Sequence, residues 1–74
     1  MISDIEVYKR GNIAYMTFLE GTHLKTEQLI SHELETGVRL QGWARVTLAD
    51  MGYRVLSWPW DASAKSYRPV VTEQ

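Results

Sequence analysis

The pattern of apolar and polar residues between Arg39 and Trp58 predicts a helix that turns directly into a strand. At 100° per residue, the apolar side of this helix consists of Leu40, Trp43, Ala44, Thr47, Leu48 and Met51. Gly52 follows, and glycine most easily takes the left-handed conformation that ends a helix. The next residues alternate as a half-buried strand does. We therefore expect a helix over 39–51 and a strand over 53–58.

A shorter helix is expected over residues 27–36, just before this stretch. Thr26 has the side chain of an N-cap, and Glu27 follows at the end of the helix dipole that favours a carboxylate. The apolar residues of the segment would share one side of the helix, and Gly37 would end it.

The first twenty-one residues allow two structures. Ser3 and Glu6 have the spacing of a capping box, which favours a helix over residues 4–19. Gly11-Asn12 is a two-residue turn signal between segments rich in β-branched and aromatic residues, which favours a hairpin. Both structures stay open at this point.

Two prolines shape the end of the chain. Pro59 ends regular pairing after the strand, because proline has no N–H to donate. A polar loop follows, and a return strand over 66–71 contains Pro69, which confines that strand to a sheet edge. The two strands would form a hairpin.

Length and composition indicate one small folded domain over residues 1–74, with segments 1–21, 22–52 and 53–72. The chain is 45% hydrophobic and 23% charged, as in an ordinary globular protein. Cysteine is absent, which excludes disulfides and thiolate metal sites. The start lacks the pattern of a signal peptide, and no apolar run approaches a membrane span. We expect a cytoplasmic protein with no membrane partner.

The formal net charge of −1 hides an uneven distribution. Residues 1–37 carry six acidic and three basic residues, whereas residues 38–72 carry five basic and two acidic ones. The positive part is therefore the part with the longer helix and the hairpin.

The order of these elements resembles the winged helix-turn-helix. Thr36-Gly37-Val38 would be the turn between helices 27–36 and 39–51, and Gly52-Tyr53-Arg54-Val55 leads into a wing over 53–58 and 66–71. The C-terminal part is similar to the winged-helix tails of phage and plasmid replication proteins, and a hairpin at the N-terminus would make it similar to small excisionase-like proteins. The implied fold class is α+β, a small winged helix-turn-helix preceded by an N-terminal hairpin or helix.

This resemblance implies a protein that binds double-stranded DNA, such as a phage-type regulator of transcription or an accessory factor in the host cytoplasm. In the family, the outer face of the second helix reads the major groove. Carried over, the DNA-binding residues are Arg39, Gln41 and Arg45 on the helix, and Arg54, Lys65 and Arg68 on the phosphates. A surplus of three positive charges is small for one copy, so a homodimer would help by doubling the contact area.

The alternative is an adaptor or inhibitor that binds a host protein. Trp58 and Trp60 flank a proline, and tryptophan is enriched at the energetic centres of protein interfaces. The interface residues would be Trp58, Trp60 and Tyr67, with Glu27, Glu33 and Glu35 as an acidic face that imitates nucleic acid.

Catalysis is not expected. His23 and His32 are the two histidines, and neither has a partner at metal-ligand spacing. No nucleophile elbow or phosphate-binding glycine loop is present in the sequence. We expect no metal, no cofactor and no enzyme activity.

Overall fold

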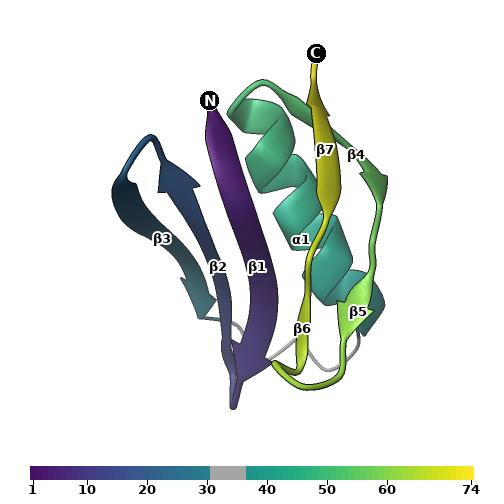
Figure 1. Cartoon of the computed structure of the whole chain (residues 1–74). Helices are drawn as coiled ribbons and strands as arrows, with labels where there is room; N and C mark the ends of the chain where they lie inside the picture. Colours follow the sequence, from purple (N-terminus) through teal and green to yellow (C-terminus); the bar gives the residue numbers. More distant parts are fainter. Residues whose placement is uncertain (31–36) are drawn as a thin grey trace.

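The computed structural model describes residues 1–30 and 37–74, which form seven strands and one helix in two antiparallel sheets (Figure 1). The elements are β1 (Ile2–Arg10), β2 (Ile13–Glu20), β3 (His23–Ile30), α1 (Gly37–Asp50), β4 (Tyr53–Ser57), β5 (Trp60–Asp61), β6 (Ser66–Tyr67) and β7 (Val70–Glu73). One sheet has the strand order β3-β2-β1-β6-β5, and the other pairs β4 with β7. The fold is mostly β, so the prediction of a winged helix-turn-helix with two helices is wrong.

The first thirty residues form a three-stranded meander. Gly11 and Gly21 stand first in the two turns with φ of 59° and 63°, the geometry of two-residue type II′ hairpins. Alternate residues of β2 are buried, and the second half of β1 follows the same alternation after a register shift, with Val7 opposite Met16 and both fully buried. The N-terminal segment is therefore a hairpin. Its alternating apolar residues lie on one face of a sheet, whereas in a helix they would be spread around the axis.

The helix expected over 27–36 is contradicted in its first part. Thr26, the expected N-cap, lies in the middle of β3 opposite Thr17, and Glu27 lies opposite Met16. The tight turn at Gly21 delivers β3 to the edge of β2, and pairing along the whole strand outweighs the local helix signals. The remainder, residues 31–36, lies outside the described residues.

The helix of the opening stretch is present as α1. Leu40, Ala44 and Leu48 are buried at a spacing of four, and Arg45 on the opposite side is exposed, as the periodicity predicted. The helix begins at Gly37, which had been expected to end the preceding helix. Gly52 ends it with a φ of 95°, and its N–H donates to the carbonyl of Ala49 at 3.0 Å.

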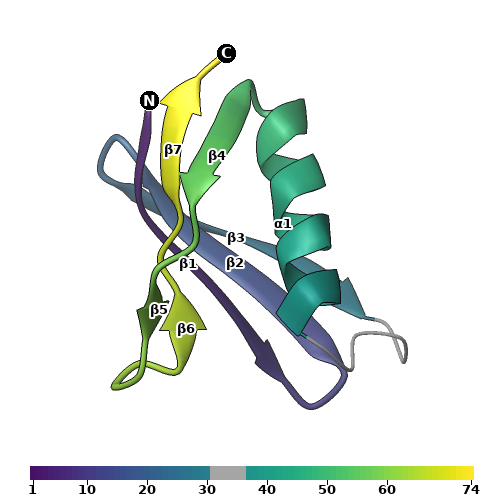
Figure 2. The ribbon, with the colours of Figure 1, turned by 90° about the vertical axis from the view of Figure 1, so that its right-hand side faces the viewer.

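The C-terminal hairpin is divided between the two sheets. β4 pairs with β7, whereas β5 and β6 form the tip and join the large sheet beside β1 (Figure 2). The division falls at Pro59 and Pro69, where the ladder loses two N–H donors. One hydrogen bond spans the break, from the N–H of Arg68 to the carbonyl of Pro59 at 2.8 Å. The expected wing is thus no free-standing hairpin.

The core lies on one side of the large sheet, which we call its inner face. It consists of Ile2, Ile5, Val7, Ala14, Met16, Phe18, Leu40, Ala44 and Leu48. The helix contacts β1 and β4, and Figure 1 shows β3 on the far side of β1 and β2 from it. The opposite, outer face carries Tyr8, Tyr15 and Thr17, all partly exposed, so the sheet is covered on one side. In the described part of the chain, α1 is too short and too polar to cross a bilayer.

Candidate functional site

The residues predicted to contact DNA are spread over several surfaces. Arg39 and Arg45 are exposed on α1, Gln41 is partly buried there, and Arg54 is exposed on β4. Lys65 lies in the turn between β5 and β6, and β4 and β5 separate it from α1 in the sequence. In the described residues α1 has no preceding helix to set it in a groove, so the geometry does not favour readout by this helix.

Arg68, a predicted phosphate contact, is engaged within the protein. Its Nη2 donates to Glu6 Oε1 at 2.6 Å, and its Nε donates to Asp61 Oδ2 at 3.0 Å. The hydrogen bond to Asp61, followed by the charge of Glu6, raises the pKa of the Arg68 guanidinium. Arg68 therefore fastens β6 to β1 and to β5.

The turn between β5 and β6 is held by Asp61. Asp61 Oδ1 accepts hydrogen bonds from the N–H groups of Ser63 at 3.0 Å and Ala64 at 3.1 Å. The bond from Ala64, followed by that from Arg68, lowers the pKa of the Asp61 carboxyl below its usual value. The turn then places Lys65 in a left-handed conformation with a φ of 52°.

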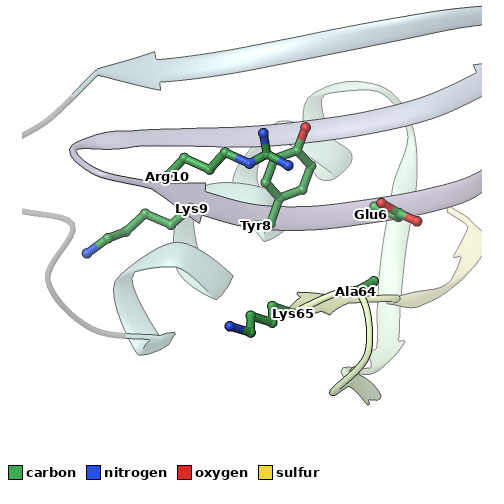
Figure 3. Close-up of a pocket in the computed structure, with 6 residues that line it drawn as sticks. All are labelled: Glu6, Tyr8, Lys9, Arg10, Ala64 and Lys65. Atoms are coloured by element: carbon green, nitrogen blue, oxygen red, sulfur yellow. The ribbon is translucent and has the colours of Figure 1, made fainter.

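Lys65 lies beside the end of β1 in a shallow pocket lined by Glu6, Tyr8, Lys9, Arg10, Ala64 and Lys65 (Figure 3). Three of these residues are cations, and the carboxylate of Glu6 is held by Arg68. The volume is about 280 Å³, at the lower limit of small-molecule sites, so the pocket suits a phosphate group better than a large ligand. We call Tyr8, Lys9, Arg10 and Lys65 the cationic corner.

Aromatic rings continue the cationic corner onto the outer face of the sheet. The rings of Tyr8 and Tyr15 are stacked with centroids 5.2 Å apart and an interplanar angle of 20°. The guanidinium carbon of Arg10 lies 5.3 Å from the centre of the Tyr8 ring, a cation–π contact visible in Figure 3. Positive charge and aromatic rings are therefore adjacent, with Arg10 exposed and both tyrosines partly exposed.

Sequence reasoning included Lys65 and missed the other three residues of the cationic corner. Lys9 and Arg10 belong to the acidic half of the chain, so comparing the net charges of the two halves did not single them out. The fold brings them to Lys65 because β1 pairs with β6, with Val7 opposite Tyr67. The sequence signal that was available is the run Tyr8-Lys9-Arg10 directly before a hairpin turn.

The aromatic residues of the protein-binding alternative do lie together. The Tyr67 ring meets Trp58 at 6.0 Å and Trp60 at 4.8 Å between centroids, both edge to face. Trp58 packs against the core, whereas Trp60 is 53% exposed. We call Trp58, Trp60 and Tyr67 the aromatic cluster.

Of the three acidic residues in that alternative, the structure describes Glu27 alone. Glu27 lies on β3, at the opposite edge of the sheet from β5, and Glu33 and Glu35 lie outside the described residues. No three potential metal ligands come together within 1–30 and 37–74. Comparisons with protein families, curated proteins and solved structures find no match for the chain.

Proposed function

We propose that the protein binds single-stranded nucleic acid, with phosphates at the cationic corner and bases on the tyrosines of the outer face. Proteins that bind single strands without sequence preference combine a positive groove with aromatic rings on which bases stack. Here the supporting observation is that Lys9, Arg10 and Lys65 line one pocket with Tyr8, whose ring also contacts Arg10. A single strand fits better than a duplex, because the cationic corner and its tyrosines lie on strands of a sheet and not on a helix that could enter a groove.

The conformation of Lys65 is a second reason to look for function here. A left-handed backbone at φ 52° favours glycine or asparagine, and a lysine held there costs stability. Strained residues concentrate at functional positions, so this conformation supports a binding role for the Lys65 side chain.

The test is a titration of a fluorescently labelled mixed-sequence oligonucleotide of about 12 nucleotides, followed by anisotropy between low and physiological salt, since such sites cover roughly 4–16 nucleotides. Three phosphate contacts predict that log K falls with log salt at a slope of about −2. Lys65→Asn relieves the backbone strain and removes one cation, so it should weaken binding and lower the slope by about 0.7.

Arg54→Gln is the matched control, because it removes one exposed cation from β4, outside the cationic corner. Its binding curve should coincide with that of the parent protein. Arg45→Gln repeats the control on α1 and tests the groove-reading helix directly. Absence of salt-dependent binding, or equal losses from Lys65→Asn and Arg54→Gln, would overturn the proposal.

A second candidate is protein binding through the aromatic cluster, favoured by the half-exposed Trp60 that rests on Tyr67. An exposed tryptophan packed against a second aromatic ring is typical of interface anchors. Immobilised protein should then capture a specific partner from a lysate, and Trp60→Ala should abolish the capture while Arg54→Gln preserves it. Identical captured proteins with all three forms would remove this candidate.

A further inference from the structure

Strand β3 leaves one side of its backbone open. It is the edge of the large sheet, it pairs with β2 alone, and every residue from His23 to Leu29 is exposed. Leu24 is 71% exposed. The helix lies over β1 and β4, and nothing in the described part of the chain covers this edge. Long open edges invite pairing with another strand, and proteins usually block them.

The turn before β3 determines which groups point outward. Glu20 and His23 close the two-residue turn, so these two residues exchange main-chain hydrogen bonds. Because hydrogen-bonded pairs alternate along an antiparallel ladder, the odd-numbered residues of β3 bond to β2. The N–H and C=O groups of Leu24, Thr26 and Gln28 therefore point to the open side.

We propose that β3 pairs antiparallel with β3 of a second copy of this chain, with the two-fold axis at Thr26. Thr26 then faces Thr26 of the second copy as a hydrogen-bonded pair, and Leu24 faces Gln28 in the same way. Lys25 faces Glu27 of the second copy, and Glu27 faces Lys25, at non-hydrogen-bonded positions where side chains come closest. The strand is complementary to itself in backbone groups and in charge.

Neighbouring registers lack this complementarity. Moving the axis to Lys25 sets the two lysines opposite each other, and moving it to Glu27 sets the two glutamates opposite each other, an arrangement that destabilises a pair of strands. Moving it to Leu24 or Gln28 keeps outward groups paired but shortens the overlap at one end and separates Lys25 from Glu27. Charge therefore selects the Thr26 register.

The contacts also indicate how strong the dimer is. Lys25 already lies 3.0 Å from Glu20 Oε1, and pairing would place it between two carboxylates. Exposed ion pairs contribute little affinity, so Lys25 and Glu27 mainly specify the register. About six main-chain hydrogen bonds and the partial burial of Leu24 hold the two copies together. A single strand edge buries less than about 1,200 Å², the range of weak and transient complexes.

Sedimentation velocity between about 10 and 500 μM, the range suited to a weak interface, should show a reversible monomer–dimer equilibrium. Thr26→Pro should abolish the dimer, because it removes an outward N–H and leaves the ladder to β2 complete. Circular dichroism and urea unfolding would show that this variant still folds. A parent protein that stays monomeric throughout, or a Thr26→Pro variant that still dimerises, would overturn the proposal.

Charge reversal tests the register. Lys25→Glu and Glu27→Lys should each weaken the dimer about five- to tenfold, because each sets two like-charge pairs opposite each other. The double variant restores opposite charges and should dimerise nearly as well as the parent. Failure of the double variant to recover would exclude the Thr26 register.

A disulfide cross-link between the two copies provides an independent test of the dimer. The chain has no cysteine, so Thr26→Cys introduces a unique thiol. Hydrogen-bonded pairs have Cα atoms about 5.5 Å apart, within the range that a disulfide spans. Mild oxidation should convert this variant to a cross-linked dimer, while Ser63→Cys in the exposed β5–β6 turn should react much more slowly. Equal cross-linking of the two variants would contradict the proposal, and no nucleic acid is present in any of these tests.

Discussion

Nη2 of Arg68 lies 2.6 Å from Oε1 of Glu6, which joins the last hairpin to the first strand of the sheet. The same guanidinium reaches Asp61 Oδ2 at 3.0 Å. The three side chains form a network at the surface, where isolated ion pairs contribute little and geometry matters more. Its effect is to fix the β5–β6 turn against β1, and with it the position of Lys65.

The lowered pKa of Asp61 predicts loss of stability in acid. Because the pKa in the folded protein lies below the ordinary value of 3.8, the ionised carboxylate stabilises the fold above that pH. This contribution should disappear as the pH falls below 3.8 and passes the folded-state pKa. Urea unfolding at a series of pH values should show the decline. Asp61→Asn should flatten it, and an equally steep decline in that variant would contradict the assignment.

Gly42 and Gly52 should respond in opposite directions to substitution by alanine. Gly42 lies inside the helix with no atom within 4 Å of an added Cβ, so Gly42→Ala should stabilise the protein by about 0.5–1 kcal/mol. Gly52 has a φ of 95°, so Gly52→Ala should destabilise it by about 1–2 kcal/mol. Thermal and urea unfolding measure both changes. A shift of the same sign in both variants would contradict the structure at one of the two positions.

The buried face of α1 should dominate the stability of this small core. Leu48 is fully buried, so Leu48→Ala should cost about 2–5 kcal/mol in unfolding free energy, a large part of what a domain of this size has. Val46→Ala provides the control, because Val46 is 62% exposed on the opposite side, and its effect should stay within about 0.5 kcal/mol. Comparable losses from the two substitutions would show that the helix is rotated.

The two tryptophans of the aromatic cluster should differ in their contribution to stability. Trp58 packs against the core and meets the Tyr67 ring at its edge, so Trp58→Ala should lower the free energy of unfolding by about 1–3 kcal/mol, less than a fully buried tryptophan. Trp60 is half exposed, and Trp60→Ala should cost less than about 1 kcal/mol. Urea unfolding compares the two variants. A larger loss from Trp60→Ala would mean that it, and not Trp58, closes the core.

Local patterns in the sequence were sufficient for α1 and its end. The spacing of Leu40, Ala44 and Leu48 defines one face, and Gly52 is placed where a helix turns into a strand. They were insufficient for β3, where Thr26 and Glu27 carry local helix signals that pairing with β2 overrides. The availability of the β2 edge depends on the tertiary structure, and the residues near Thr26 in the sequence give no information about it.

The candidate site could likewise be predicted only in part from local sequence patterns. Lys65 was identified within a positive half of the chain, but its neighbours Lys9 and Arg10 come from the other half. Their meeting depends on the pairing of β1 with β6. Similarly, Arg68 was expected to face phosphates, and the proximity of Glu6 could not be inferred from residues so distant in the chain.

The pairing of Val7 with Tyr67 also has a consequence for the order of folding. The meander β1–β2–β3 uses neighbouring segments and two tight turns, so it can form on the microsecond scale of hairpins, about 1–10 μs each. Docking of β6 on β1 closes a loop of almost the whole chain, and contacts of such high sequence separation slow folding. During synthesis the meander leaves the ribosome first, so the free side of β1 stays unpaired until the C-terminal hairpin arrives.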